Sequence, residues 1–138
     1  MNKQHTIKQL TEAGNQSRPL GVTIVAVLMI LFGLAEVVTG FTHNFLGITT
    51  SSVNIFTYSA AAIGAFYVAS GLLILIMKKW AAALAIVLLI ADIVGRVALV
   101  VTGLYPLNSL EQVIGIVAGT AIAAVFAIYI GSKWKLFR

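Results

Sequence analysis

The stretch Ala81–Tyr105, AAALAIVLLIADIVGRVALVVTGLY, decides the fold, because it is a long, almost uniformly apolar run. Its only charged residues are Asp92 and Arg96. Spanning a bilayer takes roughly 20 predominantly apolar residues, and this run is long enough. Lipid offers no partners to backbone N–H and C=O groups, so a uniformly apolar run of this length favours a helix, which pairs those groups internally. The stretch therefore predicts a transmembrane helix that carries two opposite charges.

Three further runs of similar character lie at Leu20–Phe41, Phe56–Met77 and Val113–Gly131. The chain of 138 residues is 60% hydrophobic and 9% charged, with a mean hydropathy of +1.03. A soluble domain carries about 25% charged residues, so this chain has too few to cover a surface that faces water. We expect an all-α, integral membrane four-helix transmembrane bundle over residues 19–138, in the cell membrane and surrounded by the lipid bilayer. A polar arm over residues 1–18 precedes it.

The basic residues predict the orientation of the bundle. All of them except Arg96 lie before the first run, between the second and third, or after the fourth, and the connections 42–55 and 106–112 hold no Lys or Arg. Lys and Arg near helix ends stay in the cytoplasm, so both termini are predicted to be cytoplasmic. The positive residues behind the net charge of +5 are thus explained mostly by the orientation of the helices. We therefore expect no nucleic-acid partner.

Residue types that support catalysis or metal binding are scarce in this sequence. The chain has no cysteine, which excludes disulfides, thiolate catalysis and metals held by cysteine. It also has no phosphate-binding loop and no His and carboxylate set spaced as metal ligands. We therefore predict a non-enzymatic protein with no cofactor and no bound metal.

The fourth run has a start signal and a face of small residues. Ser109 and Gln112 are spaced as a capping box, in which each side chain binds the backbone N–H of the other residue. Small residues then recur at every fourth position, and such a face lets two helices approach closely. This helix-packing face consists of Gly115, Gly119, Ala123, Ala127 and Gly131. It fits packing within the monomer, in a homo-oligomer or in a larger membrane complex.

The ionisable residues inside the predicted spans are Glu36, Asp92 and Arg96. Each costs roughly 2.5–3.5 kcal/mol at a helix centre, so such residues usually face the interior of a bundle. Asp92 and Arg96 are four residues apart, which places them on one helix face. At about 1.5 Å per residue, Arg96 lies ~13 Å and Glu36 roughly 8 Å from the outer ends of their runs. We predict an intramembrane polar cluster of these three residues with Tyr67, which falls at a similar level.

The cluster holds two carboxylates and one guanidinium, which leaves one negative charge over. A buried surplus charge tends to be neutralised by a proton or a cation. Two interpretations stay open at this point. The cluster is either a structural clamp in an assembly or interaction subunit or a homo-oligomer, or a site in a small transporter or channel for protons, cations or small cationic solutes. The sequence identifies no substrate and no partner.

Several motifs resemble a broad group of small prokaryotic four-helix membrane proteins of unknown function. They are Arg18-Pro19-Leu20-Gly21-Val22, Tyr67, Gly71-Leu72 and Lys79-Trp80-Ala81. This resemblance covers most of the chain and implies a fold and a compartment, without an activity. The segment LAEVVTGF around Glu36 is similar to the first-helix glutamate motif of small multidrug-resistance transporters. The later motifs of those transporters, including their aromatic pore residues, are absent here.

Overall fold

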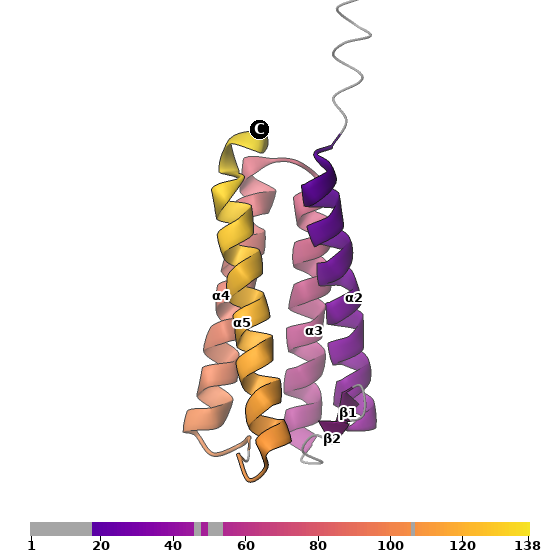
Figure 1. The fold of residues 1–138 in the computed structure, drawn as a ribbon, viewed down its shortest axis with the longest axis vertical. Coiled ribbons are helices and arrows are strands. Elements are labelled where there is room, and N and C mark those ends of the chain that lie inside the picture. Colours follow the sequence, from indigo (N-terminus) through magenta and orange to yellow (C-terminus); the bar gives the residue numbers. More distant parts are fainter. Residues whose placement is uncertain (1–17, 46–47, 50–53, 106) are drawn as a thin grey trace, which may run out of the picture.

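The computed structural model describes residues 18–45, 48–49, 54–105 and 107–138. Of the predicted arm over residues 1–18, all but Arg18 lies outside the described residues. The described chain has four long helices, which run side by side and alternate in direction (Figure 1). They are α2 (Leu20–Thr42), α3 (Asn54–Leu75), α4 (Lys79–Val101) and α5 (Leu110–Ser132), with the short strands β1 (Asn44–Phe45) and β2 (Ile48–Thr49) after α2 and the 3-10 helix η1 (Trp134–Leu136) at the end. The two strands pair antiparallel, with Asn44 opposite Thr49.

The four long helices of the described chain are each long and apolar enough to cross a membrane. The predicted all-α architecture with four helices is therefore confirmed. Most bounds differ from the predicted ones by one to four residues, and the ends of α3 and α4 come early, because a residue in left-handed backbone conformation follows each of them. Met77 has a φ of 58° and Gly103 a φ of 71°, so α3 ends at Leu75 and α4 ends at Val101.

The start of α5 follows the sequence prediction. Ser109 is the N-cap, its side chain accepts a hydrogen bond from the backbone N–H of Gln112 at 3.3 Å, and the Gln112 side chain binds the backbone N–H of Ser109. These bonds satisfy N–H groups that a helix start leaves without partners. The predicted capping box is thus confirmed.

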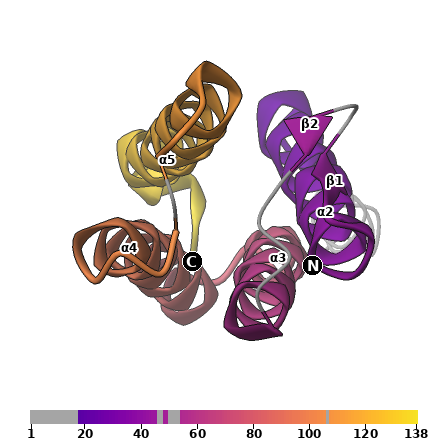
Figure 2. The same cartoon turned by 90° about the horizontal axis from the view of Figure 1, so that it is seen from below.

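The helices form two antiparallel hairpins that are joined through α3 and α4. Helix α2 packs most extensively on α3, α3 packs on α4, and α4 packs on α5, whereas α2 and α5 touch little. Figure 2, a view along the helices, shows the same order of neighbours. As a result, α2 and α5 face each other across the interior of the bundle.

Two backbones come close together between α2 and α3, where the contacts require glycine. A Cβ atom at Gly71 would lie 2.8 Å from the carbonyl oxygen of Ala26, and Gly33 and Gly64 are similarly tight against each other's helix. Small residues at a helix interface permit this approach in membrane proteins. The close packing therefore holds the first hairpin together.

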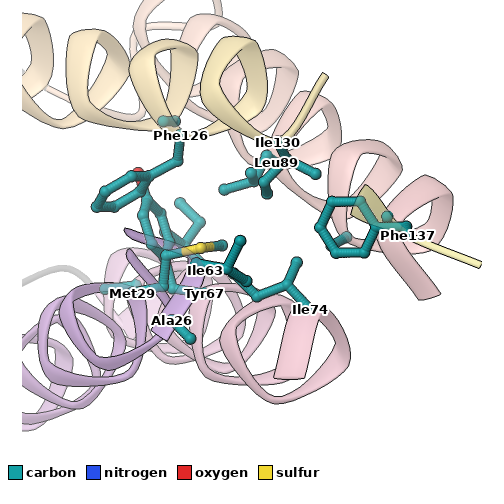
Figure 3. Close-up of a cluster of buried hydrophobic side chains, with 14 of the residues drawn as sticks. Ala26, Met29, Ile63, Tyr67, Ile74, Leu89, Phe126, Ile130 and Phe137 are labelled. Carbon is teal, nitrogen blue, oxygen red and sulfur yellow. The ribbon is translucent and has the colours of Figure 1, made fainter. Parts of the chain in front are cut away.

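The C-terminal tail closes the core at the end of the bundle where α2 begins (Figure 1). Phe137 is 2% exposed and belongs to the same buried cluster as Ile74, Leu89 and Ile130, which Figure 3 shows around it. The backbone N–H of Arg138 donates to the Met77 carbonyl at 3.0 Å, and the N–H of Lys79 donates to the Arg138 carbonyl at 2.8 Å. The tail is thus paired with the turn between α3 and α4.

Candidate binding site at the Glu36, Asp92 and Arg96 cluster

The guanidinium of Arg96 binds carboxylates on two different helices. Its Nε donates to Oδ1 of Asp92 at 2.9 Å, one turn earlier on α4. Its Nη2 donates to Oε1 of Glu36 on α2 at 3.1 Å. The structure therefore brings Glu36 to the pair Asp92 and Arg96, from which it is distant in the sequence, and these three residues link the first and second hairpins.

The three charged side chains differ in how far they are buried. The exposed fraction of the side chain is 0% for Asp92, 7% for Arg96 and 20% for Glu36. Oδ2 of Asp92 is buried and has no hydrogen-bond partner among the described residues. In such surroundings each charge depends on its partner, because removing one member of the ion pair would leave the other charge desolvated and uncompensated.

Tyr67, the fourth predicted member, links α3 to α5 beside the charges. Its hydroxyl donates to the carbonyl oxygen of Gly119 at 3.2 Å. Its ring meets that of Phe126 edge to face, with the ring centroids 6.2 Å apart, and Figure 3 shows the two side chains next to each other. Tyr67 therefore ties α3 and α5 together at the level of the cluster.

A cavity of about 140 Å³ lies beside the cluster and is lined from all four long helices. Its polar lining comes chiefly from Glu36, Arg96, Tyr67, Thr39 and Tyr105, while Asp92 is not part of its wall. Most of the remaining lining is apolar, as at Phe32, Ile63, Leu99, Ile114, Ile116 and Ile122. A concave, mainly apolar site with a few convergent polar groups is the usual form of a small-molecule site.

Tyr105 is a part of the site that the sequence prediction missed. Its place at the end of an apolar run predicts a residue of the outer aromatic belt, but it follows the end of α4, is only 5% exposed and lines the cavity. Burial raises the pKa of its phenol, and the charge of Glu36 raises it further, against the opposing effect of Arg96. The turn that carries Tyr105 inward depends on Gly103, whose φ of 71° glycine adopts without strain.

The residues of the predicted helix-packing face on α5 do not share one kind of neighbour. Gly115 and Gly119 line the cavity, Ala123 is fully buried, and Ala127 packs beside the core. A Cβ at Gly115 would have only the Tyr105 hydroxyl nearby, at 3.8 Å, and one at Gly131 would meet nothing within 4 Å. Among the described residues, therefore, the glycines of α5 do not make the backbone contacts that Gly33 and Gly64 make.

The described residues contain no group of three or more His, Cys, Asp or Glu side chains that could hold a metal ion.

Comparison of the chain with known protein families, with curated proteins and with solved structures found no match. The resemblances drawn from the motifs therefore stay predictions.

Proposed function

We propose that this chain is a multi-pass integral membrane protein that binds a proton or a small organic cation in the cavity beside Glu36, as part of a small transporter or channel. The observation that carries this proposal is the position of Glu36. It is the most exposed member of a cluster with more carboxylates than cations, and it lines a cavity between the helices. The protein acts on its ligand without covalent chemistry and requires no cofactor.

The charge of the cluster favours a monovalent cation. With both carboxylates ionised, Glu36, Asp92 and Arg96 sum to one negative charge in a desolvated environment. A monocation or a proton brings this sum to zero, whereas an anion would raise it to two negative charges. Because buried uncompensated charge is costly, the site discriminates against anions by its composition.

The size and lining of the cavity favour a compact organic cation. Its volume of about 140 Å³ is close to that of engineered protein cavities of ~150 Å³ that admit benzene. The apolar wall would contact a hydrocarbon body of that size, and Glu36 would receive the cationic group. Benzylammonium is a probe with this size and charge.

The orientation that we propose has both termini in the cytoplasm. In support of it, the turn with Lys78 and Lys79, the end of α5 and the start of α2 lie at one end of the bundle (Figure 1). Glu36 and Arg96 lie in the second halves of α2 and α4, toward the opposite end, near β1 and β2. The candidate site is therefore in the outer half of the bundle under this orientation.

Titration calorimetry with benzylammonium tests the binding step on the protein in lipid nanodiscs. We expect Glu36→Gln to weaken binding at least tenfold, because it removes the carboxylate that faces the cavity. Glu111→Gln is the matched control: Glu111 is exposed in the first turn of α5, away from the cavity wall, and its substitution should leave the affinity unchanged. Benzyl alcohol, the neutral analogue, should bind equally weakly to all three proteins. Equal affinities for benzylammonium in all three proteins would contradict the proposal.

Transport is tested separately in vesicles that contain the purified protein. Isotope-labelled benzylammonium added outside should enter these vesicles faster than protein-free vesicles, in which only the neutral amine crosses the lipid, and Glu36→Gln should reduce this flux to the protein-free rate. Binding without flux would reduce the proposal to a membrane-embedded binding protein. Neither binding nor flux in the wild type would leave the cluster as a structural clamp.

The alternative function, an assembly or interaction subunit or a homo-oligomer, is favoured by one feature of α5. Gly131 has open space around its α-carbon, and Val117, Val125 and Ile128 on the same helix are 62–70% exposed. A neighbouring helix could approach closely at Gly131. Light scattering of the purified protein should then give an oligomer, which Gly131→Leu dissociates, whereas a monomer in both proteins would contradict this alternative.

A further inference from the structure

Gly119 has surroundings unlike those of the other glycines on α5. A Cβ atom added to it would lie 2.8 Å from Cζ and 3.3 Å from Nη2 of Arg96, with Nη1 nearer still. Real Cβ atoms do not approach other heavy atoms to within 3.0 Å. The guanidinium of Arg96 therefore occupies the space that any side chain at position 119 would need.

The guanidinium has little freedom to move out of that space. It is tied to Asp92 at 2.9 Å and to Glu36 at 3.1 Å, and its side chain is 7% exposed. The planar head of arginine binds two carboxylates only in particular directions. A shift that relieves a contact at position 119 would therefore strain or break at least one of the two ion pairs.

Gly119 also contributes through its backbone, since its carbonyl oxygen accepts the hydrogen bond from Tyr67 at 3.2 Å. This bond fixes α5 against α3 at the same level, so the helix cannot retreat from the guanidinium without losing it. Gly115 and Gly131 belong to the same small-residue face but have no guanidinium and no backbone against them.

We infer that Gly119 is a positioning residue, which seats the guanidinium of Arg96 against α5 and so holds Glu36 and Asp92 in their places around the cavity. At this position of α5, the small residue thus makes room for the guanidinium of Arg96. It does not let two helix backbones approach each other. The part of this inference that concerns ligand binding rests on the proposed function, whereas the coupling between Gly119 and Arg96 does not.

A comparison of two backgrounds tests the coupling. Gly119→Ala is made in the wild type and in the uncharged triple variant Glu36→Gln, Asp92→Asn, Arg96→Gln, and thermal unfolding is followed by tryptophan fluorescence. We expect the unfolding temperature to fall in the wild type, because the guanidinium must move. It should be unchanged or higher in the triple variant, where the shorter side chain introduced at position 96 leaves the space free and alanine favours the helix. Gly131→Ala, in open space, should behave alike in both backgrounds.

Equal falls in both backgrounds would mean that Gly119 matters for helix packing, and no fall in the wild type would mean that the guanidinium is not seated there. Both results would overturn the inference. If the triple variant does not fold, Arg96→Lys supplies the second background, because lysine keeps the charge but has no planar head. The effect of Gly119→Ala should be smaller there than in the wild type.

The consequence for the site is measured by calorimetry with benzylammonium in lipid nanodiscs. Gly119→Ala should weaken binding about as much as Glu36→Gln does, at least tenfold, whereas Gly131→Ala should leave it unchanged. Unchanged affinity in Gly119→Ala, with the wild type binding normally, would overturn the positioning role. No binding by the wild type would contradict the proposed function, and the comparison of backgrounds would then still decide whether Gly119 seats Arg96.

Discussion

Gly33 on α2 and Gly64 on α3 each occupy the space where the other's side chain would be. A Cβ at Gly33 would lie 2.6 Å from the carbonyl oxygen of Gly64, and one at Gly64 would lie 2.5 Å from that of Gly33. Backbone atoms cannot turn aside as a side chain can, so this reciprocal contact fixes the spacing of the two helices. Glu36 and Tyr67 each follow one of these glycines by three residues, so the contact also sets their relative positions.

The contact between Gly33 and Gly64 predicts that alanine is poorly tolerated at either position. Gly33→Ala and Gly64→Ala should each lower the free energy of unfolding by about 1–3 kcal/mol, the usual cost of overpacking. Gly95→Ala is the control, because a Cβ there would meet nothing within 4 Å, and it should leave stability unchanged or slightly raised. Unfolding in a denaturing detergent measures all three. Similar effects at Gly95 and Gly33 would argue against the contact.

The docked C-terminal tail predicts a large effect of truncating Phe137. Its side chain is 2% exposed, and Phe→Ala in a core costs about 3–5 kcal/mol. Leu136→Ala, at a residue 40% exposed in the same segment, should cost much less. The free energy of unfolding checks the difference, and limited proteolysis should remove the tail faster in Phe137→Ala. Equal stability of the two variants would show that the tail does not support the core.

The proposed orientation predicts the side from which single cysteines react. The chain has no native cysteine, so cysteines can be introduced without background labelling. Those at Thr49 and Ser109 should react with a membrane-impermeant maleimide from outside the cell, and one at Ser132 should react only after the cells are opened. Labelling of one position from both sides would mean that the protein inserts in two orientations.

Much of the architecture could be predicted because membrane spans follow from length and hydropathy. The pairing of Glu36 with Arg96 was within reach for a similar reason: the rise per residue converts sequence position into depth along roughly parallel helices. Hydropathy does not mark where a helix ends inside an apolar run, so it places Tyr105 within the third span. The true position of Tyr105 in the cavity wall depends on Gly103, whose conformation the pattern does not reveal.

The small residues show a different limit of sequence reasoning. The regular spacing on α5 predicts a packing face, yet the reciprocal backbone contact is made by Gly33 on α2 and Gly64 on α3. Spacing along one helix says which residues share a face, but it does not say what that face meets. The role of Gly119 likewise depends on where a side chain from another helix ends, which only the tertiary structure shows.

The charge cluster itself predicts an order of stability among its variants. Arg96→Ala should be the most damaging single change, because it leaves Asp92 and Glu36 without their shared cation, and breaking a buried pair costs roughly 3–5 kcal/mol. Asp92→Asn should be milder, since Glu36 still neutralises Arg96 at 3.1 Å. Thermal unfolding of the two purified variants measures this order, and the reverse order would show that Glu36 alone does not neutralise Arg96.

The uncharged triple variant Glu36→Gln, Asp92→Asn, Arg96→Gln separates stability from function. It should recover much of the stability that Arg96→Ala loses, because no ionised group is then buried without a partner. Under the proposed function it should nevertheless fail to bind benzylammonium, since the carboxylate that faces the cavity is gone. Calorimetry on the folded triple variant checks this directly. If that variant binds the cation as the wild type does, the apolar wall of the cavity, and not the charge of Glu36, is what selects the ligand.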